Sequence, residues 1–315
     1  MRSSIKTVLS QYQVRKTYKQ KQAFIGFMQR HASEHGYQLE QQHYKRGRGR
    51  NLIVGNPETA ELIVTAHYDT PPNALLPITT VVSNLPIYLI SQFLMFLPII
   101  FVFWLLQLLM TATFGGIGVL AAPIFFFGLD ISLFVFIMLI LWCFQMMMGF
   151  ANRNNANDNT SGVSVLLSLL EELPSHQRSK VCFVFFDEEE KGLEGSKFFK
   201  KCYYKEVRFK PLINFDCVAH GKQLMFITKK EFRTSEFNQL LAEVIEGKAM
   251  LAEARRYVYP SDQLIFKQGV GVVAVHRLPV LGYYLSRLHS RFDHKFAIEN
   301  IETLNQIMIE FIKKI

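Results

Sequence analysis

The chain has 315 residues, of which 50% are hydrophobic and 19% are charged. This composition excludes an intrinsically disordered chain, since disordered chains lack the apolar residues that form a core. The net charge is +9, but the basic residues are scattered along the sequence, so we expect a solvated basic surface and no nucleic acid partner. The four cysteines lack the paired spacing of a disulfide framework or a thiolate zinc site.

The N-terminal part of the chain has the pattern of a small α/β unit. Val14 to His35 is predicted to form an amphipathic helix, and Asn51 to Val54 and Glu61 to Ala66 are predicted to be strands. The sequence from Met1 to Gln22 has basic residues but no continuous apolar stretch, so we expect no secretory signal there.

An almost unbroken apolar block follows at residues 78–148, with Asp130 as its only formal charge. The stretches 85–110 and 131–148 are long enough to cross about 30 Å of hydrocarbon. We therefore predict an inserted transmembrane helical hairpin with these two crossings. The intervening stretch 112–129 is rich in glycine and is predicted to be re-entrant or interfacial.

The charges around the block predict its orientation. Arg153 follows the second crossing and a basic region precedes the first, while the far loop has no lysine or arginine. The positive-inside rule then predicts a multi-pass protein of the cell membrane, in contact with the lipid bilayer and with its catalytic domain in the cytoplasm. Two interpretations of the insert stay open: a plain anchor, or an element that delivers apolar peptides to a nearby site.

The sequence after the block alternates between helices and strands. Ser161 to Leu173 is predicted to be a helix, and Lys180 to Phe186 a buried strand. Further strands are expected at Leu212–Phe215, Gln223–Ile227 and Val270–Val275, and further helices at Ser196–Tyr203, Ser235–Glu246 and Ile301–Lys314. This order predicts an α/β fold, a three-layer sandwich around a mixed, largely buried sheet. The domain is expected to be discontinuous, formed by residues 1–77 and 149–315 with the transmembrane insert at 78–148.

Two short polar motifs flank the apolar block. His67 and Asp69 follow a predicted strand in a His-x-Asp pattern, which offers an imidazole ligand with a carboxylate that can fix its tautomer. Asp158 stands at a predicted helix start, where it can be either a metal ligand or an N-terminal cap. If both motifs serve one site, an even number of crossings must connect them.

A run of four carboxylates, from Asp187 to Glu190, ends the strand at Lys180 to Phe186. Ligands bind at strand ends in open α/β sheets, and adjacent carboxylates repel unless a cation offsets them. A divalent metal is therefore favoured over a solvated acidic turn.

Further metal-ligand types follow in the C-terminal half. Asp216 ends another predicted strand, and His289 and Asp293 precede the last helix. Together with His67 and the carboxylates above, they form a nitrogen and oxygen donor set that suits two zinc or similar ions in a co-catalytic site.

These motifs resemble those of the M28 family of zinc aminopeptidases, the bacterial leucyl-aminopeptidase-like group. The matching stretches, in order, are Ala66–Asp69, Asn157–Val163, Glu189–Ser196, Asn214–Asp216, Ser261–Asp262, and His289 with Asp293. The resemblance covers nearly all of the chain outside the apolar block. It departs from the family only where that block is inserted.

The resemblance implies a role for each matching residue. Five residues would ligate two divalent metal ions, most simply zinc, with Asp158 bridging both: His67, Asp158, Glu190, Asp216 and His289. Glu189 would be the general base and Asp69 would orient His67. Because three glutamates are consecutive, only the spacing to Gly192–Leu193 selects Glu189 and Glu190 over Glu188 and Glu189.

The implied activity is hydrolysis of the residue at the free N-terminus of a peptide, by water activated at the metals. Two alternatives stay open. One is a glutaminyl cyclase-like acyltransferase, an activity that the same fold hosts with a single zinc. The other is a non-catalytic peptide-binding membrane scaffold. The preferred side chain, the native metal and the oligomeric state do not follow from the sequence.

Overall fold

A ten-stranded mixed sheet forms the centre of the molecule. The computed structural model describes residues 1–74, 77–94 and 149–315 and twelve positions between 97 and 145. The strands are β1 (Leu39–Tyr44), β2 (Gly49–Val54), β3 (Leu62–His67), β4 (Ile78–Val82), β5 (Val181–Phe186), β6 (Leu212–Phe215), β7 (Gln223–Thr228), β8 (Met250–Glu253), β9 (Gly269–Leu278) and β10 (Gly282–Leu288). Their order is β1-β2-β5-β3-β6-β9-β10-β4, with β7 pairing β9 and β8 pairing β7.

The middle of this sheet is parallel. Strands β5, β3, β6 and β9 run in the same direction, whereas β2, β10 and β7 pair antiparallel at its margins. The carboxyl ends of β3, β5 and β6 therefore lie side by side, and the sequence places His67, the acidic run and Asp216 directly at those ends.

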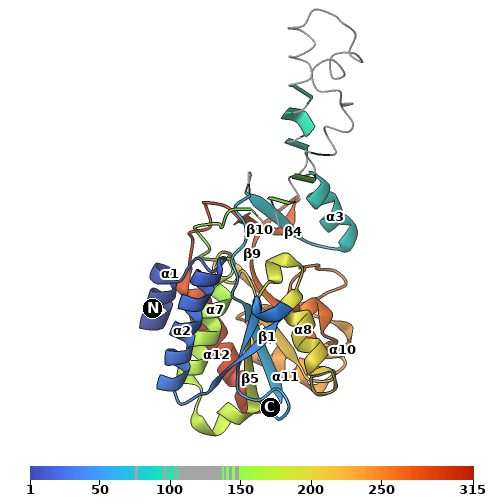
Figure 1. Ribbon diagram of the computed structural model, residues 1–315. Coiled ribbons are helices and arrows are strands. Elements are labelled where there is room, and N and C mark those ends of the chain that lie inside the picture. The colour runs from blue at the N-terminus through green and yellow to red at the C-terminus, as the bar shows by residue number, and fades with distance from the viewer. Residues whose placement is uncertain are drawn as a thin grey trace, which may run out of the picture.

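Helices cover the sheet (Figure 1). The longer ones are α1 (Ser3–Gln11), α2 (Tyr18–Glu34), α3 (Leu85–Leu94), α7 (Thr160–Glu172), α8 (Glu194–Cys202), α11 (Glu236–Ile245) and α12 (Ile298–Lys314). The short ones are α9 (Tyr204–Val207), α10 (Lys230–Arg233), and the 3-10 turns η1 (Lys45–Gly47), η2 (Ser175–Lys180), η3 (Glu189–Lys191) and η4 (Asp262–Ile265).

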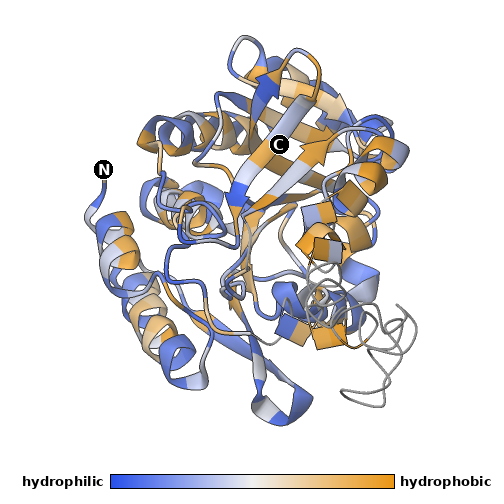
Figure 2. Ribbon diagram, turned by 90° about the horizontal axis from the view of Figure 1, so that it is seen from above, coloured by the Kyte–Doolittle hydropathy of each residue, from blue (hydrophilic) through white to orange (hydrophobic). Residues whose placement is uncertain are grey.

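Alternation along the strands gives the sheet two apolar faces. In β5, Phe183 and Phe185 belong to the core that contains side chains of α1, α2, α7, α11 and α12. Val184 and Phe186 point the other way, into a core with Phe199 of α8. Helix α1 has both hydrophilic and hydrophobic residues (Figure 2), and its Ile5 and Val8 are buried in the first of these cores. The predicted α/β fold with a mixed, buried sheet is thus confirmed.

The prediction of a multi-pass protein in the cell membrane, with its catalytic domain in the cytoplasm, is contradicted. Among the residues that the structure describes, no helix has both the length and the apolarity needed to span a bilayer. The inserted hairpin is accordingly not supported.

The remaining predictions for the apolar block lie largely outside the described residues. The segment 112–129 and Asp130 are outside them entirely, and only five positions of 131–148 are inside. At the start of the block, the residues predicted to begin the insert instead form β4, which pairs antiparallel with β10. The division of the chain into 1–77 plus 149–315, with an insert at 78–148, stays a prediction.

Candidate metal centre

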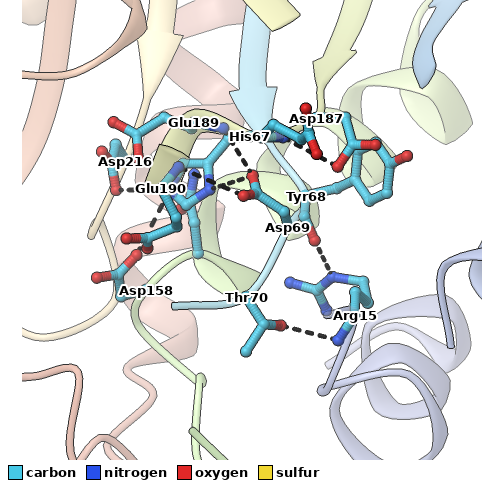
Figure 3. Close-up of polar contacts among 12 residues, drawn as sticks. Arg15, His67, Tyr68, Asp69, Thr70, Asp158, Asp187, Glu189, Glu190 and Asp216 are labelled. Atoms are coloured by element: carbon cyan, nitrogen blue, oxygen red, sulfur yellow. Dashed lines mark hydrogen bonds and ion pairs between the residues drawn. The ribbon is translucent and has the colours of Figure 1, made fainter. Parts of the chain in front are cut away.

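The predicted ligands converge at one end of the parallel strands (Figure 3). His67 is the last residue of β3, Glu190 lies in η3 after β5, and Asp216 directly follows β6. Asp158 precedes α7, and His289 directly follows β10. Elements from five separate parts of the sequence therefore contribute to a single cluster.

The donor atoms of this cluster divide into two sets that share Asp158. The Nε2 atom of His67 lies 3.4 Å from Oδ1 of Asp158 and 3.6 Å from Oδ1 of Asp216. The Nε2 atom of His289 lies 3.2 Å from Oδ2 of Asp158 and 3.5 Å from Oε2 of Glu190. The two carboxylate oxygens of Asp158 thus face two different imidazoles.

These distances fit shared metal ions. Two donor atoms bound at about 2.0–2.1 Å to a tetrahedral zinc lie about 3.4 Å apart. Both ring nitrogens of His67 and Oδ1 of Asp216 are buried and have no hydrogen-bond partner. Unpartnered buried polar atoms are costly, so a group that binds them is expected here. The donor set and its geometry therefore fit two divalent ions, one on each side of Asp158.

The electrostatics of the cluster favour bound cations. Burial raises the pKa of Glu189 and of Glu190 well above the usual value, and neighbouring carboxylates such as Asp216 raise both further. Burial also raises the pKa of Asp262 to about 7. Burial alone would lower the pKa of His67, but the facing carboxylates of Asp158 and Asp216 outweigh it and raise that pKa well above its usual value. The site thus gathers more negative charge than its own side chains neutralise.

The first two carboxylates of the acidic run differ from the last two. Asp187 forms an ion pair with the buried Lys21. Glu188 lies 3.2 Å from Nζ of Lys45 and 2.7 Å from Nζ of Lys191. Among the described residues, no lysine or arginine lies within 4.0 Å of the carboxylates of the two glutamates that follow. The two glutamates without such a partner are the ones that the spacing to Gly192–Leu193 selects, and their roles stay a prediction.

Asp69 holds the loop that carries these two glutamates. Its Oδ1 accepts the backbone N–H of Glu189 at 3.1 Å and its Oδ2 that of Glu190 at 3.3 Å. Oδ1 also lies 3.4 Å from Nδ1 of His67. Although burial opposes it, the adjacent imidazole of His67 lowers the pKa of Asp69. Asp69 therefore connects a predicted ligand, His67, to the loop of the predicted base.

Asp293 plays a similar part for Asp158. Its two carboxylate oxygens accept the backbone N–H groups of Asn157 at 2.9 Å and of Asp158 at 3.0 Å. Asn159 accepts the N–H of Gly162 at 2.9 Å and so caps α7 in place of Asp158. Asp158 is consequently free to face the histidines.

A buried arginine was not identified from the sequence. Arg15 donates from Nε to the carbonyl of Tyr68, and from Nη1 to Oγ1 of Thr160 at 3.1 Å, while its backbone N–H binds Oγ1 of Thr70 at 2.8 Å (Figure 3). It connects the segment after β3 to the start of α7. Burial lowers its pKa to about 10, against the attraction of Asp69. It is one of four basic residues between positions 15 and 21, and nothing in that local pattern indicates its partners.

A cleft of about 240 Å³ opens over the cluster. Its floor carries the predicted ligands and Glu189, and its walls come from β4, α3 and the segment before η4. The wall residues are Ile78, Thr80, Tyr88, Gln92, Tyr259, Pro260 and Leu288. The first part of the apolar block thus contributes to the cleft wall.

The fold and the site define an α/β protein with a cluster of metal donors at the strand ends. Comparison with known protein families matches residues 147–311 to peptidase family M28. The chain belongs to this family, as its motifs predict, and the predicted class of enzyme, a peptidase of this family, is confirmed. No curated protein sequence matches the chain.

Solved structures share the fold. A Zn-dependent exopeptidase from Parabacteroides distasonis is 14% identical with a TM-score of 0.57, over 98% of this chain and 96% of that one. The LapA aminopeptidase of Legionella pneumophila is 12% identical with a TM-score of 0.55, over 99% of this chain and 68% of that one. A glutaminyl cyclase from Porphyromonas gingivalis is 14% identical with a TM-score of 0.57, over 99% of this chain and 97% of that one. At these identities the likeness concerns the fold.

Proposed function

We propose that the chain is a di-zinc aminopeptidase that removes the N-terminal residue of a peptide. The observation that carries this proposal is the position of Asp158, whose two oxygens face His67 and His289 at 3.4 and 3.2 Å. In the proposed assignment His67 and Asp216 hold one ion, and His289 and Glu190 hold the other. The aminopeptidase and the Zn-dependent exopeptidase that share the fold support this choice of metal and reaction.

Glu189 is the proposed general base. Its carboxylate lies in the same donor cluster as His67 and Glu190, and burial raises its pKa. A base with a raised pKa accepts a proton from water more readily and can return it to the leaving amine. Bound metal ions would supply Lewis acidity, lowering the pKa of water and polarising the scissile carbonyl. Asp69 would hold both the base and His67 in position.

The cleft supports a peptide substrate with an apolar first residue. Ile78, Tyr88 and Leu288 offer apolar surface within the same cleft as Glu189 and Asp158. A cleft of about 240 Å³ is small, so it suits the end of a chain better than its middle. The free amino group of such a substrate carries a positive charge, which the acidic floor would attract.

Replacing the proposed base tests the mechanism. Glu189→Gln keeps the size of the side chain but cannot accept a proton, so peptidase activity should fall by about 10²- to 10⁴-fold. Zinc content should be unchanged, because this residue is not a proposed ligand. The measurement is kcat on leucyl peptides beside metal analysis of the same sample. A variant with near wild-type turnover would refute the assignment.

Glutaminyl cyclisation is the second candidate. The cyclases from Porphyromonas gingivalis and Bacteroides thetaiotaomicron have TM-scores of 0.57 and 0.55, equal to those of the peptidases. Product analysis on matched peptides beginning with Gln or with Leu separates the two activities. Release of free leucine supports the peptidase, whereas formation of pyroglutamate without release supports the cyclase. The complete set of five donors argues against a non-catalytic scaffold.

A further inference from the structure

Two histidines lie one turn apart near the end of α2, at His31 and His35. Glu171, near the end of α7, faces them. It lies eleven residues beyond Thr160, the first residue of α7, which places it about 16 Å along the helix from the Asp158 end. This cluster therefore shares no residue with the candidate metal centre.

The three side chains present donor atoms to a common point. One ring nitrogen of each histidine and a carboxylate oxygen of Glu171 all lie within 4.8 Å of one another. The Nε2 atom of His31 is 3.3 Å from Oε1 of Glu171, and the two imidazole rings have centroids 4.5 Å apart. The separation between His31 and Glu171 is close to the spacing of about 3.4 Å between two ligands of one zinc ion.

Hydrogen bonding fixes which nitrogen of His35 is available. Its Nδ1 lies 2.9 Å from the carbonyl oxygen of His31. Since a carbonyl only accepts, Nδ1 carries the proton and Nε2 keeps its lone pair. Metal-binding histidines are commonly oriented by this kind of bond from the other ring nitrogen to a backbone carbonyl.

His31 provides the second observation. The residue is only 6% exposed, and its Nε2 atom is buried without a hydrogen-bond partner, although a carboxylate oxygen stands 3.3 Å away. The nitrogen is therefore near Glu171 without the alignment of an N–H donor. Two ligands of a common ion have this arrangement, in which both lone pairs point to a third atom.

The two arginines near this cluster, Arg2 and Arg178, do not bind the ring nitrogens of the histidines or Oε1 of Glu171. Arg2 donates to Oε2 of Glu171 at 3.0 Å, while the hydroxyl of Ser4 donates to Oε1. Arg178 donates to the carbonyl of His35 and not to its ring. Arg2 therefore leaves Oε1 of Glu171, which also accepts from Ser4, to the histidine side.

We propose that His31, His35 and Glu171 form a further metal site, specific for a divalent transition ion that accepts imidazole ligands, such as Zn²⁺ or Ni²⁺. With three protein ligands, the ion would connect α2 to α7 and stabilise the packing of the N-terminal helices against the body of the domain. The site does not depend on the proposed peptidase function.

Zinc stoichiometry tests the site. The full chain is dialysed against buffered free Zn²⁺ and analysed for bound metal, together with His35→Ala and the control His43→Ala, which removes an exposed histidine of β1. His35→Ala should bind one zinc fewer than the wild type, and His43→Ala the same number. Equal zinc content in all three proteins would overturn the proposal.

Two further variants separate this site from the catalytic one and from misfolding. Glu171→Gln keeps the shape that Arg2 and Ser4 contact, and should also lose one zinc. Asp158→Ala, proposed to empty the catalytic centre, should retain one zinc, and adding His35→Ala should remove it. If Glu171→Gln keeps the full zinc content, or if the double variant retains the same zinc as Asp158→Ala, the site does not exist.

Discussion

The acidic run after β5 contains two kinds of carboxylate. Asp187 is paired with Lys21 and Glu188 with two other lysines, whereas Glu189 and Glu190 face the histidines with no such partner among the described residues. The paired carboxylates hold the loop in place, and the unpaired ones retain the negative charge that binds cations. Neighbouring residues of nearly identical chemistry thus differ in role because of what the rest of the chain places beside them.

The largest effect is expected from Asp158→Ala, which removes the carboxylate shared by both donor sets. Both catalytic ions should be lost, and peptidase activity should fall by roughly 10³-fold or more, since bound ions supply several kcal/mol of transition-state stabilisation. Metal analysis and kcat measure this effect. Loss of only one ion would contradict the bridging assignment.

A matched pair of substitutions tests the difference between the paired and the unpaired carboxylates of the acidic run. Glu190→Gln removes a proposed ligand, so zinc affinity on the His289 side should fall by roughly a hundredfold or more. Even the mutation of a residue that only hydrogen-bonds to a metal ligand lowers metal affinity by about 10- to 100-fold. Glu188→Gln should leave zinc affinity unchanged. Competition with a chelator measures both. Equal losses in the two variants would show that the register is wrong.

Lys21→Met tests the paired half of the run. The side chains of Lys21 and Asp187 are 6% and 0% exposed, so removing the lysine leaves a buried charge without a partner. The free energy of unfolding should fall by about 3–5 kcal/mol. Lys45→Met is the control: that side chain is 45% exposed, and a change of about 0–1 kcal/mol is expected. Urea denaturation of the two variants measures the difference, and similar values would contradict it.

The smallest effect is expected from Asp69→Asn. The amide can accept only one of the two N–H bonds from Glu189 and Glu190, and it loses the charge beside His67. Activity should fall by about 10- to 100-fold with the metal centre still assembled. A drop as large as that of Asp158→Ala would mean that Asp69 is itself a ligand.

Local pattern predicted much of the fold. Lys180 to Phe186 is a continuous apolar run, and it became β5 (Val181–Phe186) at the centre of the sheet. The helix predicted from Val14 begins instead at Tyr18, because Thr17 and Gln20 form a capping box. Strand β10 was missed since it is only partly buried, and its pairing with β4 joins residues far apart in the chain.

The cell-membrane localisation predicted from the apolar block is contradicted, since no helix among the described residues can span a bilayer. Hydropathy does not distinguish a membrane segment from apolar residues that build a cleft wall, as Ile78 and Tyr88 do. The predicted ligands do lie together. This could be predicted because several of their motifs directly follow strands, and the carboxyl ends of parallel strands meet at one edge of the sheet. The partners that hold them, such as Arg15 for the Tyr68 carbonyl and Asp293 for the Asp158 amide, could not be predicted, since those bonds depend on tertiary packing.

The central claim is that two ions flank Asp158. It is tested most directly by a crystal structure of the zinc-loaded chain with anomalous diffraction at the zinc edge. Our account predicts two peaks at this site, one between His67 and Asp216 and one between His289 and Glu190, each about 2.0–2.2 Å from a different oxygen of Asp158. A single peak at this site, or a peak there that does not contact Asp158, would contradict it.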